Sequence, residues 1–386
     1  MFSSRLPDVL ATNAFSTAIA DLRARGVSLT DLTVTNPTAV GLSYPPDLLA
    51  TLADPAGLTY APTPFGLWSA REAVAREITT DHEPVDPSRV VLTASTSEAY
   101  SLLFKLLCDP GDTVLTPAPS YPLFDLLTQL DGVVAAPYRL EPHGLWSIDR
   151  ESMTHAWSPR AKAILVVSPN NPTGSMLRRD DREWLVAFAR ERSLALISDE
   201  VFAGYPVDPG PDVVSLQNEH RVLTFTLGGL SKSVGLPQLK LGWIVVSGPD
   251  DGVGEAQRRL ELICDAYLSV STPVQVAAPR LIAEGAAMRV AIRARVMENY
   301  RALQRIAAGY PSVRVLPLEG GWSAMLRVPT TGDEEALVLR ILDEAHVVVH
   351  PGYFFDVDHG SHLVMSLLPE PTVFAAALRQ ALDIAS

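Results

Sequence analysis

Short apolar segments alternate with helical patterns through the middle of the chain. Seven segments are rich in Val, Ile, Leu and Thr and do not alternate strictly between apolar and polar residues: 89–95, 112–117, 133–140, 161–169, 194–200, 221–229 and 240–248. Runs of this kind are typical of strands buried on both faces of a mostly parallel sheet. Helical patterns at 96–107 and 179–193 lie between them. This alternation predicts an α/β domain with right-handed crossovers.

The last two predicted strands have a different connection. Too few residues separate Leu227 from Lys240 for a crossover helix of normal length. We therefore expect the strand at 240–248 to run antiparallel to the strand at 221–229.

The pattern changes after Gly248. Helical patterns occupy 255–270, 273–285, 286–309 and 371–386, and shorter apolar segments occur at 312–329, 346–355 and 362–368. The fold class that we predict is α/β, with a mostly parallel seven-stranded sheet flanked by helices in a large domain. A smaller α+β domain is formed by the N- and C-terminal segments. The predicted divisions are 1–46 (N-terminal arm and part of the small domain), 47–277 (large domain) and 278–386 (C-terminal small domain).

Composition narrows the class of protein. The 386 residues are 47% hydrophobic and 19% charged, as in globular proteins, and the formal net charge is −13. This acidic balance argues against nucleic acids and anionic membranes as partners. The two cysteines have no metal-site spacing, so we predict neither a zinc site nor a disulfide framework. No secretory-type apolar core or membrane-spanning run occurs, and we expect a cytoplasmic protein.

Polar residues follow the ends of several predicted strands. They are Ser95, Thr96, Tyr121, Asn171, Asp199, Ser231 and Lys232. Taken singly, each has an ordinary structural role as a helix cap, turn, packing or surface residue. Ligands of open α/β sheets bind at the carboxyl ends of the strands. Together, in this order, these residues therefore predict one ligand site.

Three motifs connect these residues to a known family: SPNNPTG (168–174), SDEVF (198–202) and LSKSVGLPQLKLGW (230–243). With them, the chain resembles the class I/II aminotransferases, which are fold-type-I enzymes that use pyridoxal 5′-phosphate. The resemblance extends from TVTNPT (33–38) to the C-terminal sheet.

The resemblance implies a role for each residue around the cofactor ring. Lys232 would form the Schiff base with the cofactor aldehyde and then move the substrate proton. Asp199 would pair with the protonated ring nitrogen, whose pKa it raises. Asn171 would donate to the phenolic oxygen of the ring, and Tyr121 would stack on the ring face.

The resemblance also implies how the cofactor phosphate is bound. Ser95 and Thr96 would offer backbone amides and a hydroxyl at a helix N-terminus, and Ser231 would add a hydroxyl. Lys240 occupies the position at which the family usually has an arginine, so it keeps the charge but loses the bidentate fork. The family often has a serine at the position of Gly229, where that contact is missing.

Two further segments imply a homodimer with shared active sites. Tyr60, in LTYAPTPFG, matches a family tyrosine that reaches the phosphate of the neighbouring subunit. The segment 268–275 matches one near the subunit interface. The partners that we expect are a second copy of the chain and small-molecule amino and keto substrates.

The sequence departs from the family at two positions. Phe202 replaces a tyrosine that donates to the ring oxygen. Val364 lies at or near the position of the arginine that grips the substrate α-carboxylate, and no Arg or Lys occurs between Arg340 and Arg379. Candidate residues for the substrate are Asn36, Trp322, His362 and Tyr353.

The alternatives to an aminotransferase are other reactions of the same cofactor: C–S β-elimination, racemisation, or a biosynthetic cyclisation or replacement. The missing arginine favours them, and the fold does not decide between them. We also considered a ligand-sensing regulator, but such members carry an added DNA-binding domain. A plain nucleotide-binding protein is disfavoured because the chain has no G-x-G-x-x-G motif or P-loop.

Overall fold

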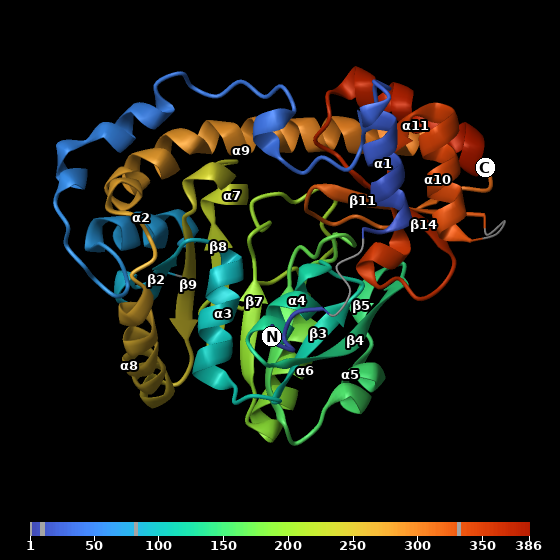
Figure 1. Ribbon diagram of the computed structural model, residues 1–386. Coiled ribbons are helices and arrows are strands. Elements are labelled where there is room, and N and C mark those ends of the chain that lie inside the picture. Colours follow the sequence, from blue (N-terminus) through green and yellow to red (C-terminus); the bar gives the residue numbers. More distant parts are fainter. Residues whose placement is uncertain (1, 8–11, 81–83, 330–332) are drawn as a thin grey trace.

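The computed structural model of the protein describes residues 2–7, 12–80, 84–329 and 333–386 (Figure 1). An eight-stranded sheet in the order β2-β9-β8-β7-β6-β3-β4-β5 forms the centre of the large domain. Its strands are β2 (Val90–Thr93), β3 (Thr113–Ala118), β4 (Val134–His143), β5 (Leu145–Ile148), β6 (Ala161–Val167), β7 (Ala195–Asp199), β8 (Thr224–Gly229) and β9 (Gly242–Ser247). Seven of these are the strands that the apolar segments predict, so the predicted mostly parallel sheet is confirmed.

The directions of the strands follow the expected pattern. β3, β4, β6, β7 and β8 are parallel to their neighbours within this group, whereas β9 is antiparallel to both β8 and β2. The predicted reversal at β9 is therefore confirmed. The additional strand, β5, pairs antiparallel with β4 through a tight turn at Gly144, whose φ is +83°. A hairpin of this kind is a local addition at the sheet edge and does not change the arrangement of the parallel strands.

Helices cover both faces of the large sheet. They are α2 (Trp68–Ile78), α3 (Thr96–Leu107), α4 (Leu123–Leu130), α5 (Arg150–Ala156), α6 (Arg179–Arg192), α7 (Leu230–Ser233) and α8 (Asp250–Tyr267). Leu103 of α3 and Leu260 of α8 are buried in one apolar cluster with residues of the sheet, and Leu185 of α6 is buried in another. β7, β8 and β9 are buried along their whole length, which explains why their sequences do not alternate.

The prediction of separate helices at 273–285 and 286–309 is wrong. A single helix, α9 (Thr272–Ala307), crosses the width of the molecule from the large domain to the small domain (Figure 1). Gly285, where we expected a break, lies inside this helix, and a Cβ there would come 2.6 Å from Val234. The glycine therefore allows close packing and does not end the helix. The division that we predict between 277 and 278 falls within α9.

The N- and C-terminal segments form the small α+β domain. Its sheet has the order β10-β11-β14-β13, all antiparallel, with β10 (Arg314–Val315), β11 (Ser323–Val328), β13 (His350–Pro351) and β14 (Ser361–Ser366). The N-terminal strand β1 (Thr30–Asp31) pairs in parallel with β12 (Val347–Val348). The helices are α1 (Ala14–Ala24), α10 (Glu334–Ala345) and α11 (Pro371–Ala385). Within the described part of the chain, no helix is both long enough and apolar enough to span a membrane.

Candidate active site

Two ionisable residues meet where β7 and β8 end. Asp199 is the last residue of β7, and Lys232 lies in α7, directly after β8. The two strands are parallel neighbours, with Asp199 beside Leu227, so both residues lie at the same edge of the sheet. The charge of Lys232 also acts on the pKa of Asp199, which shows that the two groups are within electrostatic reach. The tertiary structure thus brings together two residues that are far apart in the sequence.

Asp199 is buried and has two hydrogen-bond donors. The Tyr100 hydroxyl donates to Oδ2 at 2.6 Å, and the Val201 amide donates to Oδ1 at 3.0 Å. Burial raises the pKa of Asp199, while these two donors and the charge of Lys232 oppose the rise. We did not single out Tyr100 from the sequence. The sequence feature that could have identified it is a phenol among the aliphatic residues of the buried face of α3.

Lys232 lies against aromatic rings. Its Nζ is 4.8 Å from the centroid of the Trp322 ring and 5.5 Å from that of Phe202. Burial lowers the pKa of Lys232 to about 8, and Asp199 opposes this shift. A substantial fraction of the amine is therefore neutral near pH 8, as a nucleophile requires.

The aromatic residues beside Lys232 also contact one another, and one of them is hydrogen-bonded to the Lys232 backbone. Phe202 and Tyr205 both contact Trp322 edge-to-face, with ring centroids 5.3 and 5.0 Å apart. The Tyr205 hydroxyl donates to the backbone carbonyl of Lys232. From the sequence we noted only that Phe202 lacks the hydroxyl of the tyrosine that it replaces. In the structure its ring forms part of the surface beside the amine. The Nε1 of Trp322 is buried and has no hydrogen-bond partner among the described residues.

The two asparagines of SPNNPTG have different surroundings. Asn170 is buried, accepts a hydrogen bond from Ser120 at 2.8 Å and donates to the carbonyl of Pro119 at 2.9 Å. Asn171 is half-buried, and within the described part of the chain its side chain makes no hydrogen bond. Asn170 therefore holds the loop together, whereas the amide of Asn171 has no partner among the described residues.

Ser95 and Thr96 lie where α3 begins. Ser95 is the N-cap residue, and its hydroxyl accepts the amide of Glu98 at 3.1 Å. Gly242 faces this turn: a Cβ there would come 3.1 Å from the carbonyl carbon of Ser95. Gly242 also pairs with Gly229 across β8 and β9, and a Cβ at Gly229 would lie 3.2 Å from the carbonyl of Leu241. The glycines bring the helix N-terminus and the β8 end close together.

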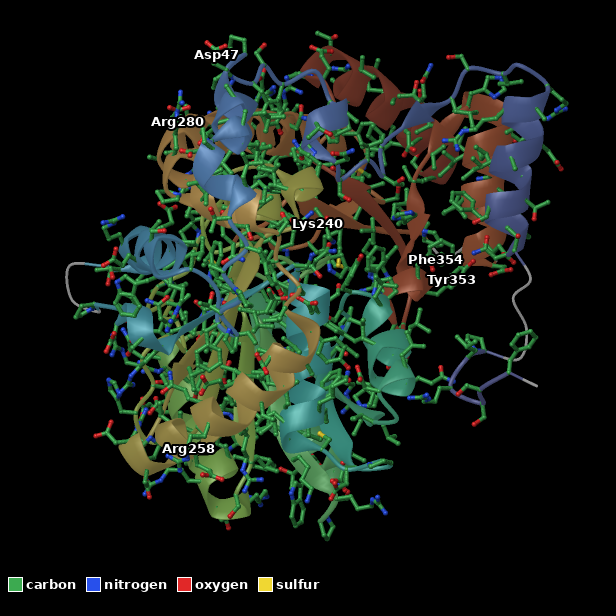
Figure 2. The ribbon with its side chains drawn as sticks, turned by 60° about the vertical axis from the view of Figure 1, so that its left-hand side comes forward. Asp47, Lys240, Arg258, Arg280, Tyr353 and Phe354 are labelled. Carbon is green, nitrogen blue, oxygen red and sulfur yellow. The ribbon has the colours of Figure 1, made fainter. Side chains whose placement is uncertain are left out.

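The remaining residues predicted around the cofactor are more open. Ser231 is half-buried, and Lys240 is exposed, with a left-handed φ of +53° (Figure 2). Tyr121 is 42% exposed and contacts Phe124 edge-to-face, and Phe124 in turn contacts Tyr100. A chain of aromatic contacts thus leads from Tyr121 to the ring that donates to Asp199. Tyr60 is 73% exposed on the surface of this single chain.

Of the four substrate candidates, the structure brings Trp322 against Lys232. Asn36 caps the short helix η1 (Pro37–Ala39), where its Oδ1 accepts from the amide of Thr38. Tyr353, in η6 (Gly352–Phe355), makes contacts toward α10, with its amide donating to Glu334 at 2.9 Å (Figure 2). His362 lies on β14 beside Arg327 of β11. The contacts of Tyr353 and His362 are therefore with the small domain and not with Lys232.

An apolar cluster surrounds Val364, the position at which the family resemblance leads us to expect an arginine. Val364 is 2% exposed and packs in one buried cluster with Trp146, Leu316, Met325 and Phe355. Met325 lies directly opposite Val364 on the neighbouring strand. This position thus holds a closed apolar surface, on which an α-carboxylate would lose its hydration without gaining a partner.

A large parallel sheet with a lysine and a carboxylate at its edge, beside a small α+β domain, defines a fold-type-I enzyme. The sequence profile of the aminotransferase class I and II family matches residues 40–373. The chain belongs to this family, whose members use pyridoxal phosphate.

Individual relatives agree with this assignment. The alanine aminotransferase of Mycobacterium tuberculosis is 27% identical over 98% of this chain and 91% of its own length. The S-alkyl-thiohydroximate lyase SUR1 of Arabidopsis thaliana is 30% identical, over 58% of this chain and 49% of its own. A solved structure of the alanine aminotransferase of Pyrococcus furiosus superposes with a TM-score of 0.88 at 24% identity, covering 100% of this chain and 98% of that one. This last likeness concerns the fold alone.

Proposed function

We propose that the protein is a cytoplasmic aminotransferase that moves an amino group between an amino acid or related amine and a keto acid by ping-pong chemistry, with Lys232 as the Schiff-base lysine. One observation carries this proposal: a half-buried lysine with its pKa lowered to about 8 shares a sheet edge with the buried carboxylate of Asp199. A lysine of this kind is suited to both nucleophilic and acid–base work.

The side chains fit pyridoxal phosphate. The carboxylate of Asp199 is suited to the ring nitrogen, the uncommitted amide of Asn171 to the phenolic oxygen and the exposed ring of Tyr121 to the ring face. The N-terminus of α3 at Ser95 and the exposed ammonium of Lys240 are suited to the phosphate, with Thr96 and Ser231 beside them. The acceptor, donor and cationic side chains of this site thus match the chemical groups of the cofactor.

The residues of the chain perform three tasks in this proposal. When bound, the cofactor supplies an aldehyde that condenses with amines and a ring that withdraws electrons. Lys232 Nζ would take the proton from the α-carbon of the substrate and deliver it to the carbon that carried the cofactor aldehyde, which requires a pKa near the working pH. Asp199 keeps the ring nitrogen protonated in surroundings that exclude water. The rings of Trp322 and Phe202 lie beside this amine and restrict its position.

We further propose that two copies of the chain form a symmetric dimer. Figure 1 shows α2 and α8 at one end of the large domain, and large apolar side chains on these helices and in the segment before α2 are exposed. They are Leu58 (90% exposed), Tyr60 (73%), Trp68 (52%), Tyr267 (57%) and Leu262 (75%). Tyr60 and Tyr267 line the same depression together with residues of the segment 268–275. A second copy that covered this surface would bury it and bring Tyr60 to the neighbouring site.

The test is an absorption experiment on the cofactor-loaded protein with a panel of amines and amino acids. Alanine and glutamate come first because relatives are named alanine and glutamate–pyruvate aminotransferases. We expect the visible band to disappear with a donor and to return with a keto acid. In the cofactor-free protein, the reaction with pyridoxal phosphate should become faster as pH increases through about 8, since the Lys232 amine must be neutral to form the Schiff base. Lys232→Ala should lower turnover by roughly 10³-fold or more. A protein that bound no cofactor would refute the proposal.

A second candidate, C–S bond elimination, is favoured by one observation. The apolar cluster around Val364 replaces the usual carboxylate clamp, and a relative is named a C–S lyase. Incubation with a cysteine S-conjugate separates the two: thiol release without keto-acid consumption supports the lyase, and amino transfer to a keto acid supports the aminotransferase.

A further inference from the structure

Three cationic or titratable residues form a row across the small sheet. Arg314 of β10 lies directly opposite Arg327 of β11, and Arg327 lies directly opposite His362 of β14. Side chains directly opposite each other point to the same face, with Cβ atoms about 5 Å apart. Like charges in such positions destabilise a sheet. The row of Arg314, Arg327 and His362, here called the basic row, therefore costs stability unless something neutralises it.

The basic row lies beside the apolar cluster of Val364. Leu316, just after β10, together with Met325 and Val364 forms the next row on the same face, two residues away from the basic row along each segment. Two residues of a strand span about 7 Å. A cationic surface thus lies one pleat away from the position at which we expected an arginine.

The two arginines of the basic row are unpaired. Both are exposed, and among the described residues neither side chain forms a hydrogen bond or has an acidic group within 4 Å. Arg139, which lines the same cavity from the large domain, is by contrast paired with Asp149. The guanidinium groups of the row are therefore available to a ligand.

His362 supplies an independent indication of a ligand. Its side chain is buried, with only 6% of the residue exposed, and its Nδ1 has no hydrogen-bond partner within the described ranges. Burial and the nearby Arg327 lower the pKa of His362, and a hydrogen bond with the backbone of Gly360 opposes this. A buried polar atom without a partner is costly and is normally satisfied. An anion beside the row would relieve the repulsion that His362 experiences from Arg327.

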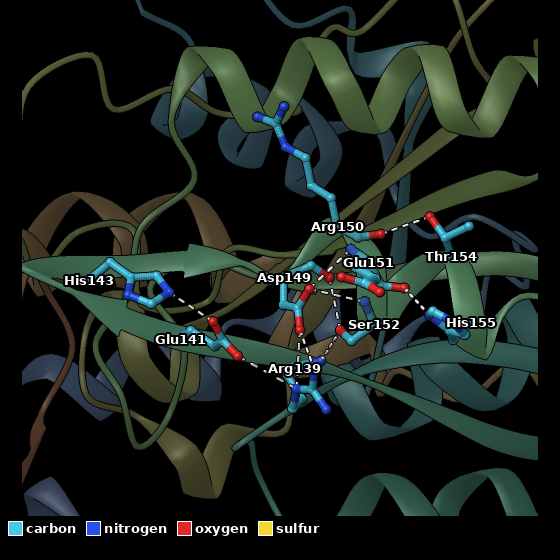
Figure 3. A network of polar contacts seen from close by, with 9 residues as sticks. All are labelled: Arg139, Glu141, His143, Asp149, Arg150, Glu151, Ser152, Thr154 and His155. Carbon is cyan, nitrogen blue, oxygen red and sulfur yellow. Dashed lines mark hydrogen bonds and ion pairs between the residues drawn. The ribbon is translucent and has the colours of Figure 1, made fainter.

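A cavity of about 390 Å³ is bounded by all three residues of the basic row. Its other wall belongs to the β4–β5 hairpin, where Arg139 is bound by Asp149 at 2.6 Å and lies 3.6 Å from Glu141 (Figure 3). His143 contacts the same Glu141 at 2.7 Å. The charges on this wall are thus already matched, and the uncompensated positive charge of the cavity is on the small sheet.

Two further acids, Asp356 and Asp358, and one histidine, His359, line the cavity. Burial and the charges of Asp125 and Asp358 raise the pKa of Asp356. Asp358 acts on Arg139, on the hairpin wall. Within the described residues neither acid lies within 4 Å of the arginines of the basic row, so neither forms an ion pair with them.

We propose that the basic row is a binding site for the carboxylate or phosphate group of a small molecule. Two guanidinium groups and an imidazole offer charge-assisted hydrogen bonds to oxyanions. The group belongs either to the far end of the substrate or to a separate anionic ligand. In the first case the site rests on the proposed function, because it selects substrates with a second acidic group.

The experiment uses the cofactor-loaded enzyme, so that the phosphate site of the cofactor is already filled. Inorganic phosphate and glutarate are titrated while the resonances of ¹³C-labelled histidine rings are followed, with His362→Asn assigning the signal of His362. We expect that signal to shift on binding in the wild type. Arg327→Gln and Arg314→Gln should each weaken binding about tenfold, the loss of one charge-assisted contact at an exposed site. Arg327→Lys, which keeps the charge and is a mild replacement, should retain part of the affinity.

The control is Arg258→Gln, on α8 at the far end of the large domain (Figure 2), which should leave binding unchanged. The titration needs no turnover, so its result is independent of the proposed function. Steady-state kinetics then separate the two sources. A raised KM for glutamate in Arg327→Gln, with the KM for alanine unchanged, assigns the site to the substrate. Weaker probe binding with both KM values unchanged assigns it to a separate ligand. An unshifted His362 signal, with no KM change in Arg327→Gln, overturns the proposal.

Discussion

Tyr100→Phe tests the electrostatics of Asp199 with the smallest change available. The substitution removes only the hydroxyl that donates to Asp199 Oδ2 at 2.6 Å. Both residues are buried, with Tyr100 3% and Asp199 6% exposed, so water does not readily replace the lost donor. The carboxylate then keeps a single donor among the contacts described, the amide of Val201 at 3.0 Å.

The expected magnitude follows from the type of contact. A hydrogen bond to a charged group contributes about 1.5–3 kcal/mol, and removing one partner leaves the other group desolvated. We therefore expect the free energy of unfolding of the cofactor-free protein to fall by about 2 kcal/mol at pH 8. Pyridoxal phosphate should bind about tenfold more weakly, because the carboxylate would be less well oriented and more often protonated.

The effect of Tyr100→Phe depends on pH with a definite sign. Burial holds the pKa of Asp199 above its unfolded value, so the folded protein binds a proton that the unfolded chain has released. Stability therefore falls as pH rises through that window. Losing the Tyr100 donor raises the folded pKa further and extends the window upward. The variant should thus be closest to wild type near pH 4 and increasingly destabilised toward pH 8.

Denaturant unfolding at several pH values and a titration with pyridoxal phosphate measure both effects. The matched control is Tyr138→Phe: Tyr138 is buried, and its hydroxyl donates to the carbonyl of Leu165 at 2.8 Å and not to a carboxylate. It should cost about 1 kcal/mol at every pH and leave cofactor binding unchanged. Equal, pH-independent losses in the two variants would refute the argument that Tyr100 acts through the charge of Asp199.

Three further substitutions test other parts of the molecule. Phe202→Tyr places a hydroxyl beside Lys232; with a donor restored, the pH midpoint of the visible band of the loaded enzyme should fall, and an unmoved midpoint would contradict this. Val364→Arg buries a charge in an apolar cluster, and we expect a loss of about 3 kcal/mol in denaturant unfolding; unchanged stability would mean that an arginine finds a partner there. Leu58→Glu, at a side chain that is 90% exposed, should shift sedimentation from dimer to monomer while leaving the unfolding of the single chain within about 0.5 kcal/mol.

The sequence determined the large sheet because buried parallel strands require continuous apolar runs. β7, β8 and β9 have no exposed residue, which is why their sequences do not alternate between apolar and polar residues. It also showed that Asp199 and Lys232 follow predicted strands, at whose carboxyl ends the ligands of such sheets bind. The family motifs around them are local in sequence, so their presence could be recognised without coordinates.

Other features depended on contacts between distant segments. Tyr100 reaches Asp199 across 99 positions of sequence, and a phenol on a helix carries no sign of which residue it will meet. The sequence predicts a helix end at Gly285. In the structure α9 continues through this position, and the glycine allows close packing against Val234. Asn170 and Asn171 have the same side chain, and only their environments distinguish a structural amide from a free one. The basic row likewise exists because strand register aligns Arg314, Arg327 and His362. Register is a property of the paired strands, which no single segment of the chain specifies.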